Sequence, residues 1–362
     1  MILGFGEVMA RFCPPDRARW RQALPGRVEV TWGGGEANVC ASLAMLGESA
    51  RYVTALPRNA LSESLVASLR GLGVDTSRIL WRDSGRLGLY FVEPGSNQRA
   101  STVLYDREWS AVSLAGSDDY DWDAILQDVE WLHVTGITPA ISAAACDANL
   151  ELVKRARSRG VTVSCDLNFR KKLWRWKPGT APATLARKCM TEVLAFTDLV
   201  VANEEDAADV LGIHAQGTDV AAGQLDVRAY EAVARRIAAQ CPSISRVAIT
   251  LRESVSADHN NWGAMLFDRG SDTVCFAPRD VAGNYRPYEI RDIVDRIGAG
   301  DSFAAGLIHG LRSSDLGTPQ AALEFAVAAS CLKHSLPGDF NYMSRDEILA
   351  LRAGNASGRV QR

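Results

Sequence analysis

The segment DRIGAGDSFAAG, residues 295–306, combines residue types that phosphoryl transfer requires. The three small residues Gly298, Ala299 and Gly300 directly precede the acid Asp301, where a helix of small residues is expected to begin. Backbone N–H groups at such a turn can bind an anion, and the helix dipole adds positive potential. A carboxylate would repel an anion, but it can accept a proton from a hydroxyl group while the amides stabilise charge on the attacked group. We therefore predict phosphoryl transfer with Asp301 as general base; capping of the helix by Asp301 is the structural alternative.

Two candidate cations for binding a carboxylate or a phosphate stand at predicted strand ends. SCDLNFRKKLW places Asp166, Asn168 and Arg170 after an apolar strand, and ligands of parallel sheets bind beyond such carboxyl ends. The planar fork of Arg170 can hold a carboxylate or a phosphate through two parallel hydrogen bonds. A solvated arginine beside two lysines is the alternative. VLYDREWSA offers a second cation, Arg107, with Tyr105 beside it.

An acidic cluster follows a third predicted strand. VVANEEDAADVLG places Asn203, Glu204, Glu205 and Asp206 where a strand runs into a helix. Acids in a first helical turn interact favourably with the helix dipole, so capping explains the cluster. The functional alternative is the ordering of water around Mg²⁺, because a hard cation takes oxygen ligands.

Three consecutive glycines, residues 33–35, precede a helical pattern in WGGGEANVCASLAMLG. Such glycines let the backbone approach a ligand, and they serve equally well as a flexible turn. Asn38 either turns back to hydrogen-bond this loop or caps the helix. The sequence contains no GxxxxGK[ST] motif, which excludes a P-loop NTPase. In GFGEVM, Met9 stands where the dinucleotide-binding fingerprint needs its third glycine, which argues against a Rossmann dehydrogenase.

Composition favours a large α/β protein with small-molecule ligands. The 362 residues are 47% hydrophobic, enough to fill a sizeable core, and the net charge of −3 argues against nucleic acid as a partner. The eight cysteines form neither a CxxC pair nor a zinc-spaced cluster, which is typical of reduced cytosolic thiols. No apolar run approaches the roughly 20 residues of a membrane-spanning helix. The N-terminus lacks the pattern of a signal peptide, so we expect a cytoplasmic protein without a membrane partner.

The elements that must position these residues alternate along the chain. Strands are predicted over 130–136, 160–168, 198–206 and 246–254, with helices over 142–158 and 181–196, as in a parallel sheet covered on both faces. The first twelve residues predict a first strand. Residues 85–107 predict a hairpin around the turn EPGSN. With 19–31 it could form a small separate sheet, which is either a lid or a plain edge hairpin.

Together these motifs resemble the ribokinase-like carbohydrate kinases, whose second signature reads approximately D-T-x-G-A-G-D ahead of a helix of small residues. Here it stands as VDRIGAGDSF. The resemblance spans nearly the whole chain and is strongest to the 2-keto-3-deoxygluconate kinases. The further motifs that carry it are GLYF, YDREWSA, TGITPA, DLNFRKKLW, TLRES, CLKHSLPGDFN and the terminal SGRVQR.

This resemblance implies an α/β three-layer sandwich with a mostly parallel sheet and a small β lid. It implies one kinase domain over 1–345, lid segments about 13–31 and 87–105, and a C-terminal helix end with a mobile tail over 346–362. The implied activity is ATP- and Mg²⁺-dependent phosphorylation of the terminal hydroxyl of 2-keto-3-deoxygluconate to the 6-phosphate. A kinase of fructose or of the galactonate epimer is an alternative, and a non-catalytic sugar-acid sensor is opposed by the retained base. A homodimer through the lid, or a higher homo-oligomer, is also expected.

The resemblance also assigns roles to individual residues. It implies that Asp301 is the base and that the amides of Gly298, Ala299 and Gly300 form the anion hole. For the sugar it implies Gly33, Gly34, Gly35, Asn38, Tyr90, Tyr105, Arg107 and Arg170. For ATP it implies Asn203, Thr250, Arg252, Ala328, Cys331 and Lys333, and for the waters of Mg²⁺ Glu205 or Asp206. The sequence departs from the family pattern in three places: Arg296 replaces a threonine, Asp206 replaces a glutamate, and TLRES lacks a glycine.

Overall fold

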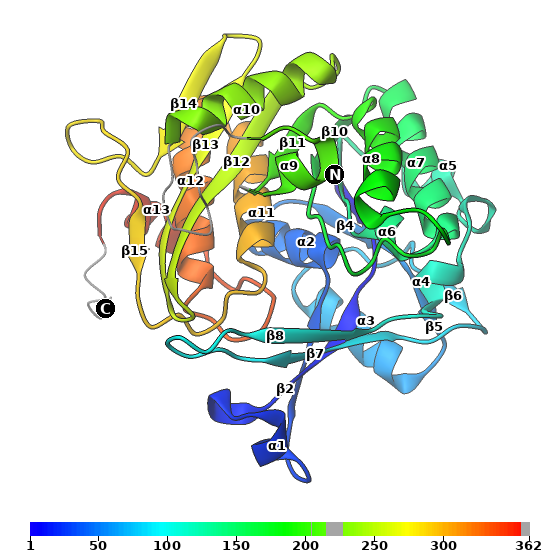
Figure 1. The fold of residues 1–362 in the computed structure, drawn as a ribbon. Helices are drawn as coiled ribbons and strands as arrows, with labels where there is room; N and C mark the ends of the chain where they lie inside the picture. The colour runs from blue at the N-terminus through cyan, green and yellow to red at the C-terminus, as the bar shows by residue number, and fades with distance from the viewer. Residues whose placement is uncertain (204, 215–226, 356–362) are drawn as a thin grey trace.

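The computed structural model describes residues 1–203, 205–214 and 227–355 and shows a sheet between two layers of helices (Figure 1). Within these residues, nine strands form the central sheet. In order across the sheet they are β14 (Thr273–Ala277), β13 (His259–Asp268), β12 (Arg246–Ser256), β11 (Leu199–Ala202), β10 (Thr162–Asp166), β9 (Trp131–Thr135), β1 (Ile2–Phe5) and β4 (Ala50–Val53), with β15 (Tyr288–Ile290) paired to β13. The run from β12 to β4 is parallel, whereas β13, β14 and β15 are antiparallel additions.

Helices cover both faces of this sheet. One face carries α2 (Gly35–Met45), α3 (Ala60–Gly71), α11 (Ala299–Arg312) and α12 (Pro319–Lys333), with α13 (Arg345–Arg352) packed on α12. The other face carries α4 (Ala111–Leu114), α5 (Trp122–Ile125), α6 (Thr138–Ile141), α7 (Ala143–Ser158), α8 (Pro182–Leu194), α9 (Asp206–Leu211) and α10 (Val227–Gln240). Side chains alternate along a strand, so Ile2 packs with the first layer while Leu3 and Phe5 pack with the second. Burial on both faces explains why the parallel strands are apolar runs.

A second, smaller sheet crosses one end of the central sheet (Figure 1). It contains β3 (Glu29–Gly33), β2 (Met9–Cys13), β7 (Gly88–Glu93) and β8 (Thr102–Asp106) in that order, and we call it the small sheet. Its inner face packs Met9, Tyr90 and Val92 together. Its outer face exposes large apolar side chains, including Val30 and Leu104. The remaining short elements are η1 (Pro15–Arg17), α1 (Trp20–Ala23), η2 (Ser117–Asp119), and the pair β5 (Ala55–Pro57) and β6 (Leu80–Arg82).

The predicted fold class is confirmed, as are the four strands from residue 130 onward and both predicted helices. The predicted hairpin is also confirmed, with Tyr90 opposite Tyr105 in register. The prediction of a single first strand is wrong. The chain forms β1 in the central sheet, leaves strand geometry at residues 6–8 and then forms β2 in the small sheet. The break is held by a hydrogen bond from the Tyr52 hydroxyl to the carbonyl of Gly6 at 2.8 Å.

The predicted lid segments correspond only in part to the strands of the small sheet, because β2 begins before residue 13 and β3 ends at Gly33. The boundaries of a kinase domain over 1–345 stay a prediction. The tail motif SGRVQR lies outside the described residues. None of the described helices is long and apolar enough to cross a membrane.

Candidate active site

One cavity of about 490 Å³ brings together most of the residues singled out in the sequence. Its lining comes from the inner face of the small sheet, from the carboxyl ends of β10 and β11, from the middle of β12, and from the start of α11. The predicted residues that line it are Gly33, Gly34, Gly35, Asn38, Tyr90, Tyr105, Arg107, Arg170, Asn203, Asp206, Thr250, Arg252, Gly298, Ala299, Gly300 and Asp301. Four predicted residues, Glu205, Ala328, Cys331 and Lys333, are not part of this lining.

The first turn of α11 presents backbone amides and a carboxylate to the same cavity. Gly298 precedes the helix with φ of 84°, in the left-handed region that glycine tolerates best. A side chain there would also collide with the Asp339 carbonyl oxygen, which lies 2.0 Å from the position of an added Cβ. The first N–H groups of a helix have no intrahelical acceptor, so this turn can bind an anion next to Asp301.

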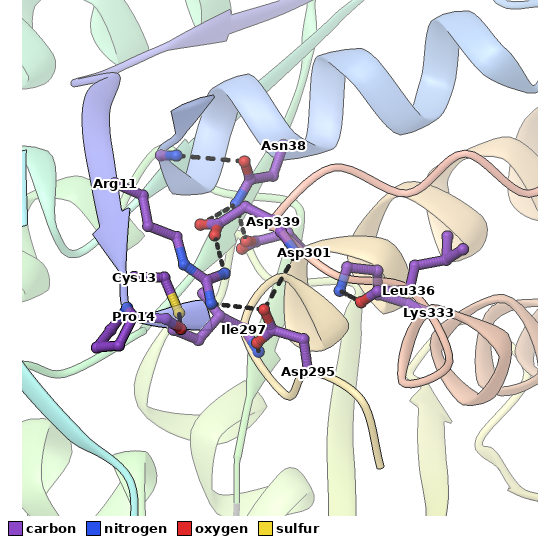
Figure 2. Close-up of polar contacts among 12 residues, drawn as sticks. Arg11, Cys13, Pro14, Asn38, Asp295, Ile297, Asp301, Lys333, Leu336 and Asp339 are labelled. Atoms are coloured by element: carbon purple, nitrogen blue, oxygen red, sulfur yellow. Dashed lines mark hydrogen bonds and ion pairs between the residues drawn. The ribbon is translucent and has the colours of Figure 1, made fainter. Parts of the chain in front are cut away.

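Asn38 fixes the orientation of the candidate base (Figure 2). Its Nδ2 donates to Asp301 Oδ2 at 2.6 Å, and its Oδ1 accepts a hydrogen bond from the Gly34 N–H at 3.2 Å. Asn38 therefore turns back to the glycine loop, as one of the two sequence interpretations expects, and its contact with Asp301 is an additional finding. The helix-capping alternative for Asp301 receives no support, because no side chain caps the start of α11.

Burial raises the pKa of the Asp301 carboxyl from 3.8 to about 7. The hydrogen bond from Asn38 opposes this shift, and the negative charges of Asp339 and Glu36 reinforce it. Arg170 lowers the pKa again by its positive charge. A carboxyl group with a pKa near neutrality is suited to accept and release a proton at physiological pH.

This raised pKa predicts a pH-dependent stability difference between the wild type and Asp301→Asn. Stability linked to the protonated carboxyl is complete below about pH 4 and is lost as the pH rises through the folded-state pKa of about 7. We expect Asp301→Asn to be more stable than the wild type by about 2 to 4 kcal/mol at pH 8, and equally stable near pH 4. Urea unfolding at both pH values measures this difference, and an unchanged stability at pH 8 would show that Asp301 ionises normally.

Arg107 is already paired with an acid that the sequence interpretation missed. Its Nε donates to Glu7 Oε2 at 2.6 Å, and its Nη2 forms an ion pair with the same carboxylate. The side chains are only 7% and 2% exposed. The guanidinium also lies 5.6 Å from the centre of the Tyr105 ring. Arg107 is therefore a fixed, charge-balanced group rather than a free cation.

The buried pair gives a second stability prediction. Arg107→Met leaves the Glu7 carboxylate buried without its partner, which should cost about 3 to 5 kcal/mol of unfolding free energy. The double variant Arg107→Met/Glu7→Gln removes both charges and should recover most of that loss. Chemical denaturation compares the two. A single variant as stable as the double variant would mean that the pair carries no net charge penalty.

Arg170 is the cation that remains available for a ligand. It is exposed, its Nη1 donates to the Phe169 carbonyl at 3.3 Å, and no described carboxylate lies within ion-pair distance of it. Asn168 beside it has a φ of 37°, and its buried Oδ1 lacks a hydrogen-bond partner in the described structure. An arginine fork next to an unused amide oxygen is suited to a small acidic, hydroxylated ligand.

The polar residues after β11 form a hydrogen-bonded turn that leads into α9. Asn203 Oδ1 accepts hydrogen bonds from the N–H groups of Glu205 and Asp206. Asp206 accepts from the N–H groups of Asn203 at 3.1 Å and Phe169 at 3.0 Å, so it braces the loop that carries Arg170. Glu205 is exposed and lies off the cavity, which leaves Asp206 as the better metal-organising candidate. Glu204 lies outside the described residues.

Burial also raises the pKa of Asp206 and raises that of Asp166 well above its usual range. The negative charge of Asp206 raises the pKa of Asp166 further, because the two carboxylates repel each other. A divalent cation would relieve that repulsion, and Mg²⁺ commonly uses one or two carboxylates and several waters. Asp166 and Asp206 therefore supply the kind of oxygen ligands that a magnesium site needs. The described residues contain no group of three or more His, Cys, Asp or Glu side chains placed to hold a metal by themselves.

The three residues predicted on α12 belong to packing rather than to the cavity. Ala328 is fully buried in a cluster with Phe325 and Ile348. Cys331 packs against the helical layer of α2 and α11. Lys333 is fully buried, and its Nζ donates to the Leu336 carbonyl at 3.2 Å. Thr250 and Arg252, in contrast, line the cavity from β12, and their role in ATP binding stays a prediction.

Several cavity residues were not assigned a role from the sequence. They are Glu7, Met9, Asn260, Trp262, His334 and Asp339. Glu7 and Asp339 lie within the quoted segments GFGEVM and CLKHSLPGDFN, where an acid between a glycine and an apolar residue was the available signal. Glu36 in GGGEAN is a related case: it is fully buried and accepts hydrogen bonds from Thr135 and Thr138.

Comparison with known proteins shows which family the chain resembles. A model of the pfkB family carbohydrate kinases matches residues 1–342. A protein of Haloferax volcanii named 2-dehydro-3-deoxygalactonokinase is 30% identical over 98% of both chains. The 2-dehydro-3-deoxygluconokinase of Bacillus subtilis is 28% identical over 96% of this chain and 93% of its own. The solved structure of a 2-dehydro-3-deoxygluconokinase from Thermotoga maritima superposes with a TM-score of 0.86, at 42% identity and 98% coverage of both chains.

The match of the family model covers nearly the whole chain, and the glycine-rich turn with its acid lies inside it. The fold is ribokinase-like, with the parallel sheet, the two helical layers and the small sheet in place. The chain belongs to the pfkB family of carbohydrate kinases.

Proposed function

We propose that this kinase transfers the γ-phosphoryl group of ATP to the terminal hydroxyl of 2-keto-3-deoxygluconate and forms the 6-phosphate. The observation that carries the proposal is the meeting of three groups in one cavity: the Asp301 carboxyl, the amides of the α11 start and the guanidinium of Arg170, which forms no ion pair with a described carboxylate. The names of the relatives, 2-dehydro-3-deoxygluconokinase and 2-dehydro-3-deoxygalactonokinase, support a keto-deoxy sugar acid as substrate.

In this mechanism Asp301 accepts the proton of the sugar hydroxyl as its oxygen attacks the γ-phosphorus. The bond between the γ-phosphorus and the bridging oxygen breaks, and ADP leaves with that bond's electron pair. The amides of Gly298, Ala299 and Gly300 stabilise the negative charge on the transferred group. The pKa near 7 lets Asp301 pass the proton to solvent after product release.

Arg170 is the proposed ligand of the sugar carboxylate. A bidentate contact from its fork fixes the acid end of the substrate and so points the opposite, terminal hydroxyl at the base. Arg107 contributes less than its charge suggests, because Glu7 already neutralises it. We propose that Arg107, Tyr105 and the neighbouring Tyr90 shape one wall of the sugar site, to which Asn38 and the glycine loop also contribute.

ATP is proposed to lie along the wall formed by Asn203, Thr250 and Arg252. Mg²⁺ would supply charge neutralisation of its phosphates, with Asp206 and Asp166 as the oxygen donors that order the metal's waters. The small sheet is proposed to act as a lid that excludes water from the cavity. Its exposed outer side chains Val30 and Leu104 support the further proposal that two copies pair through this sheet.

The eight cysteines are free thiols, five of them buried, which supports a reducing compartment such as the cytoplasm.

A coupled assay of ADP release tests the function across a panel of 2-keto-3-deoxygluconate, its galactonate epimer, fructose and ribose. We expect kcat/KM to be highest for one of the two keto-deoxy acids and roughly tenfold or more lower for the neutral sugars, as the loss of a charged hydrogen bond predicts. Faster turnover of fructose would reject the sugar-acid assignment. Tight binding of an acid with no turnover of any sugar would favour a sensor.

A further inference from the structure

A buried ion cluster joins the small sheet to the catalytic centre (Figure 2). Arg11, on β2, donates through Nη1 to Asp339 Oδ1 at 2.8 Å and pairs through Nη2 with Asp295 Oδ2 at 2.6 Å. The Arg11 and Asp339 side chains are 3% and 4% exposed. Asp295 belongs to the loop before α11, and Asp339 to the segment after α12. One guanidinium therefore ties three distant segments of the chain together.

The cluster continues to the base through a single amide. Nδ2 of Asn38, which donates to Asp301 at 2.6 Å, also lies 3.5 Å from Asp339 Oδ2. The amide cannot turn away without losing the hydrogen bond that its Oδ1 accepts from Gly34. Asp339 and Asp301 are consequently two carboxylates that share one donor group.

The backbone around Asp339 is built to keep the carboxylate in this place. An added Cβ at Gly33 would lie 2.2 Å from Asp339 Oδ2, and one at Gly298 would lie 2.0 Å from the Asp339 carbonyl oxygen. The Tyr90 hydroxyl, 2.4 Å from the same Gly33 position, also faces Asp339 and opposes the rise in the pKa of that carboxyl caused by burial. Glycines on two sides admit Asp339 where any other residue would exclude it.

Asp301 also faces charges from the other elements packed around it. Glu36 approaches from α2, Asp166 and Arg170 from the end of β10, and Lys333 from the end of α12. Each of these groups belongs to the central sheet or its helices. The pair of Asp339 with Arg11 differs, because its cation is carried by the small sheet.

We propose that Asp339, held by Arg11, is a positioning residue for the base: through the shared Asn38 amide it sets the charge and orientation that Asp301 experiences. Since Arg11 is carried by β2, the same ion pair ties docking of the small sheet to the readiness of the base. Loss of Arg11 leaves the Asp339 carboxylate without its cation beside Asp301. Neutralising Asp339 instead removes a negative charge from the surroundings of Asp301. The role of Asp301 as base rests on the proposed function.

Variants at the two positions should shift the pH profile in opposite directions. Asp339→Asn keeps the shape and removes a negative charge, so the acid limb of kcat/KM should move down by about half to one pH unit. Arg11→Met should move it up by a similar amount, and Arg11→Lys should lie between Arg11→Met and the wild type. Asp339→Asn carries the test alone where Arg11→Met fails to fold.

The matched control is Asp75→Asn, which breaks the Arg51–Asp75 ion pair of 2.7 Å, and neither of these residues lines the cavity. It should change stability and leave the pH profile unchanged. Acid limbs of Asp339→Asn and Arg11→Lys that coincide with the wild type would overturn the proposal and leave the cluster a purely structural one.

A substrate-free readout separates this inference from the proposed function. Infrared difference spectra between each protein and its Asp301→Asn counterpart follow the protonated carboxyl of Asp301 against pH. We expect the midpoint to fall in Asp339→Asn and to rise in Arg11→Met. These shifts would support the inference even if no sugar acid is phosphorylated, and unshifted midpoints would overturn it even if the kinase activity is confirmed.

Discussion

Asp301→Asn is expected to lower kcat by roughly 10² to 10⁴-fold, the usual contribution of a general base. The amide cannot accept the hydroxyl proton, while the backbone amides of the α11 start remain in place. ATP affinity should therefore stay within about threefold of the wild-type value, since the nucleotide contacts are elsewhere in the cavity. Steady-state kinetics with the best sugar acid measure the first effect, and calorimetric titration with a nonhydrolysable ATP analogue measures the second.

Asp315→Asn provides the matched control for this experiment. Asp315 follows the other end of α11, is exposed and pairs with Arg345, so the same chemical change occurs away from the cavity. It should leave kcat unchanged. Turnover by Asp301→Asn within a factor of a few of the wild type would remove Asp301 from the role of base.

Arg170→Ala is expected to raise KM for the keto-deoxy acid by roughly 10 to 100-fold, as loss of a hydrogen bond between charged groups predicts. The effect on a neutral sugar such as fructose should be small, because that substrate has no carboxylate for the fork to hold. Arg170→Lys should retain part of the affinity, since an ammonium supplies the charge without the two parallel hydrogen bonds. Initial rates over a range of both substrates test these statements.

Lys171→Ala is the control for Arg170, because the neighbouring lysine is exposed and does not line the cavity. It should leave KM for the sugar acid unchanged. If Arg170→Ala weakens the acid and the neutral sugar equally, Arg170 has no selective contact with the carboxylate, and the acid-sugar assignment loses its structural support.

The parts of the site that sequence alone predicted are local in the chain. The turn Gly298–Gly300 and Asp301 are consecutive, so their types and order already indicate an anion-binding helix start beside an acid. The carboxyl ends of the strands were predictable in the same way, because an apolar run followed by polar residues indicates a strand and the place where it ends. These two signals indicate Arg170 and Asn203 as site residues, whereas Thr250 was implied by the family resemblance, and all three line one cavity.

The parts that sequence did not predict depend on contacts between distant segments. Arg11 and Asp339 are separated by 328 positions, and no local pattern indicates that they meet. The pairing of Arg107 with Glu7 spans 100 positions and changes the meaning of that arginine from a free cation to a balanced one. The charged amine of Lys333 is typical of a ligand-binding residue, but the packing of α12 buries this side chain completely. The break between β1 and β2 was not predicted either, because a single apolar run supplies one strand to each of two sheets.

The most direct test of the central claim is the ³¹P NMR spectrum of the product formed from ATP and 2-keto-3-deoxygluconate. The proposed attack by the terminal hydroxyl predicts one new phosphate monoester per ADP, with its phosphorus coupled to the two protons of a methylene carbon. Inorganic phosphate without a sugar ester, or a phosphorus coupled to a single proton of a secondary carbon, would contradict it.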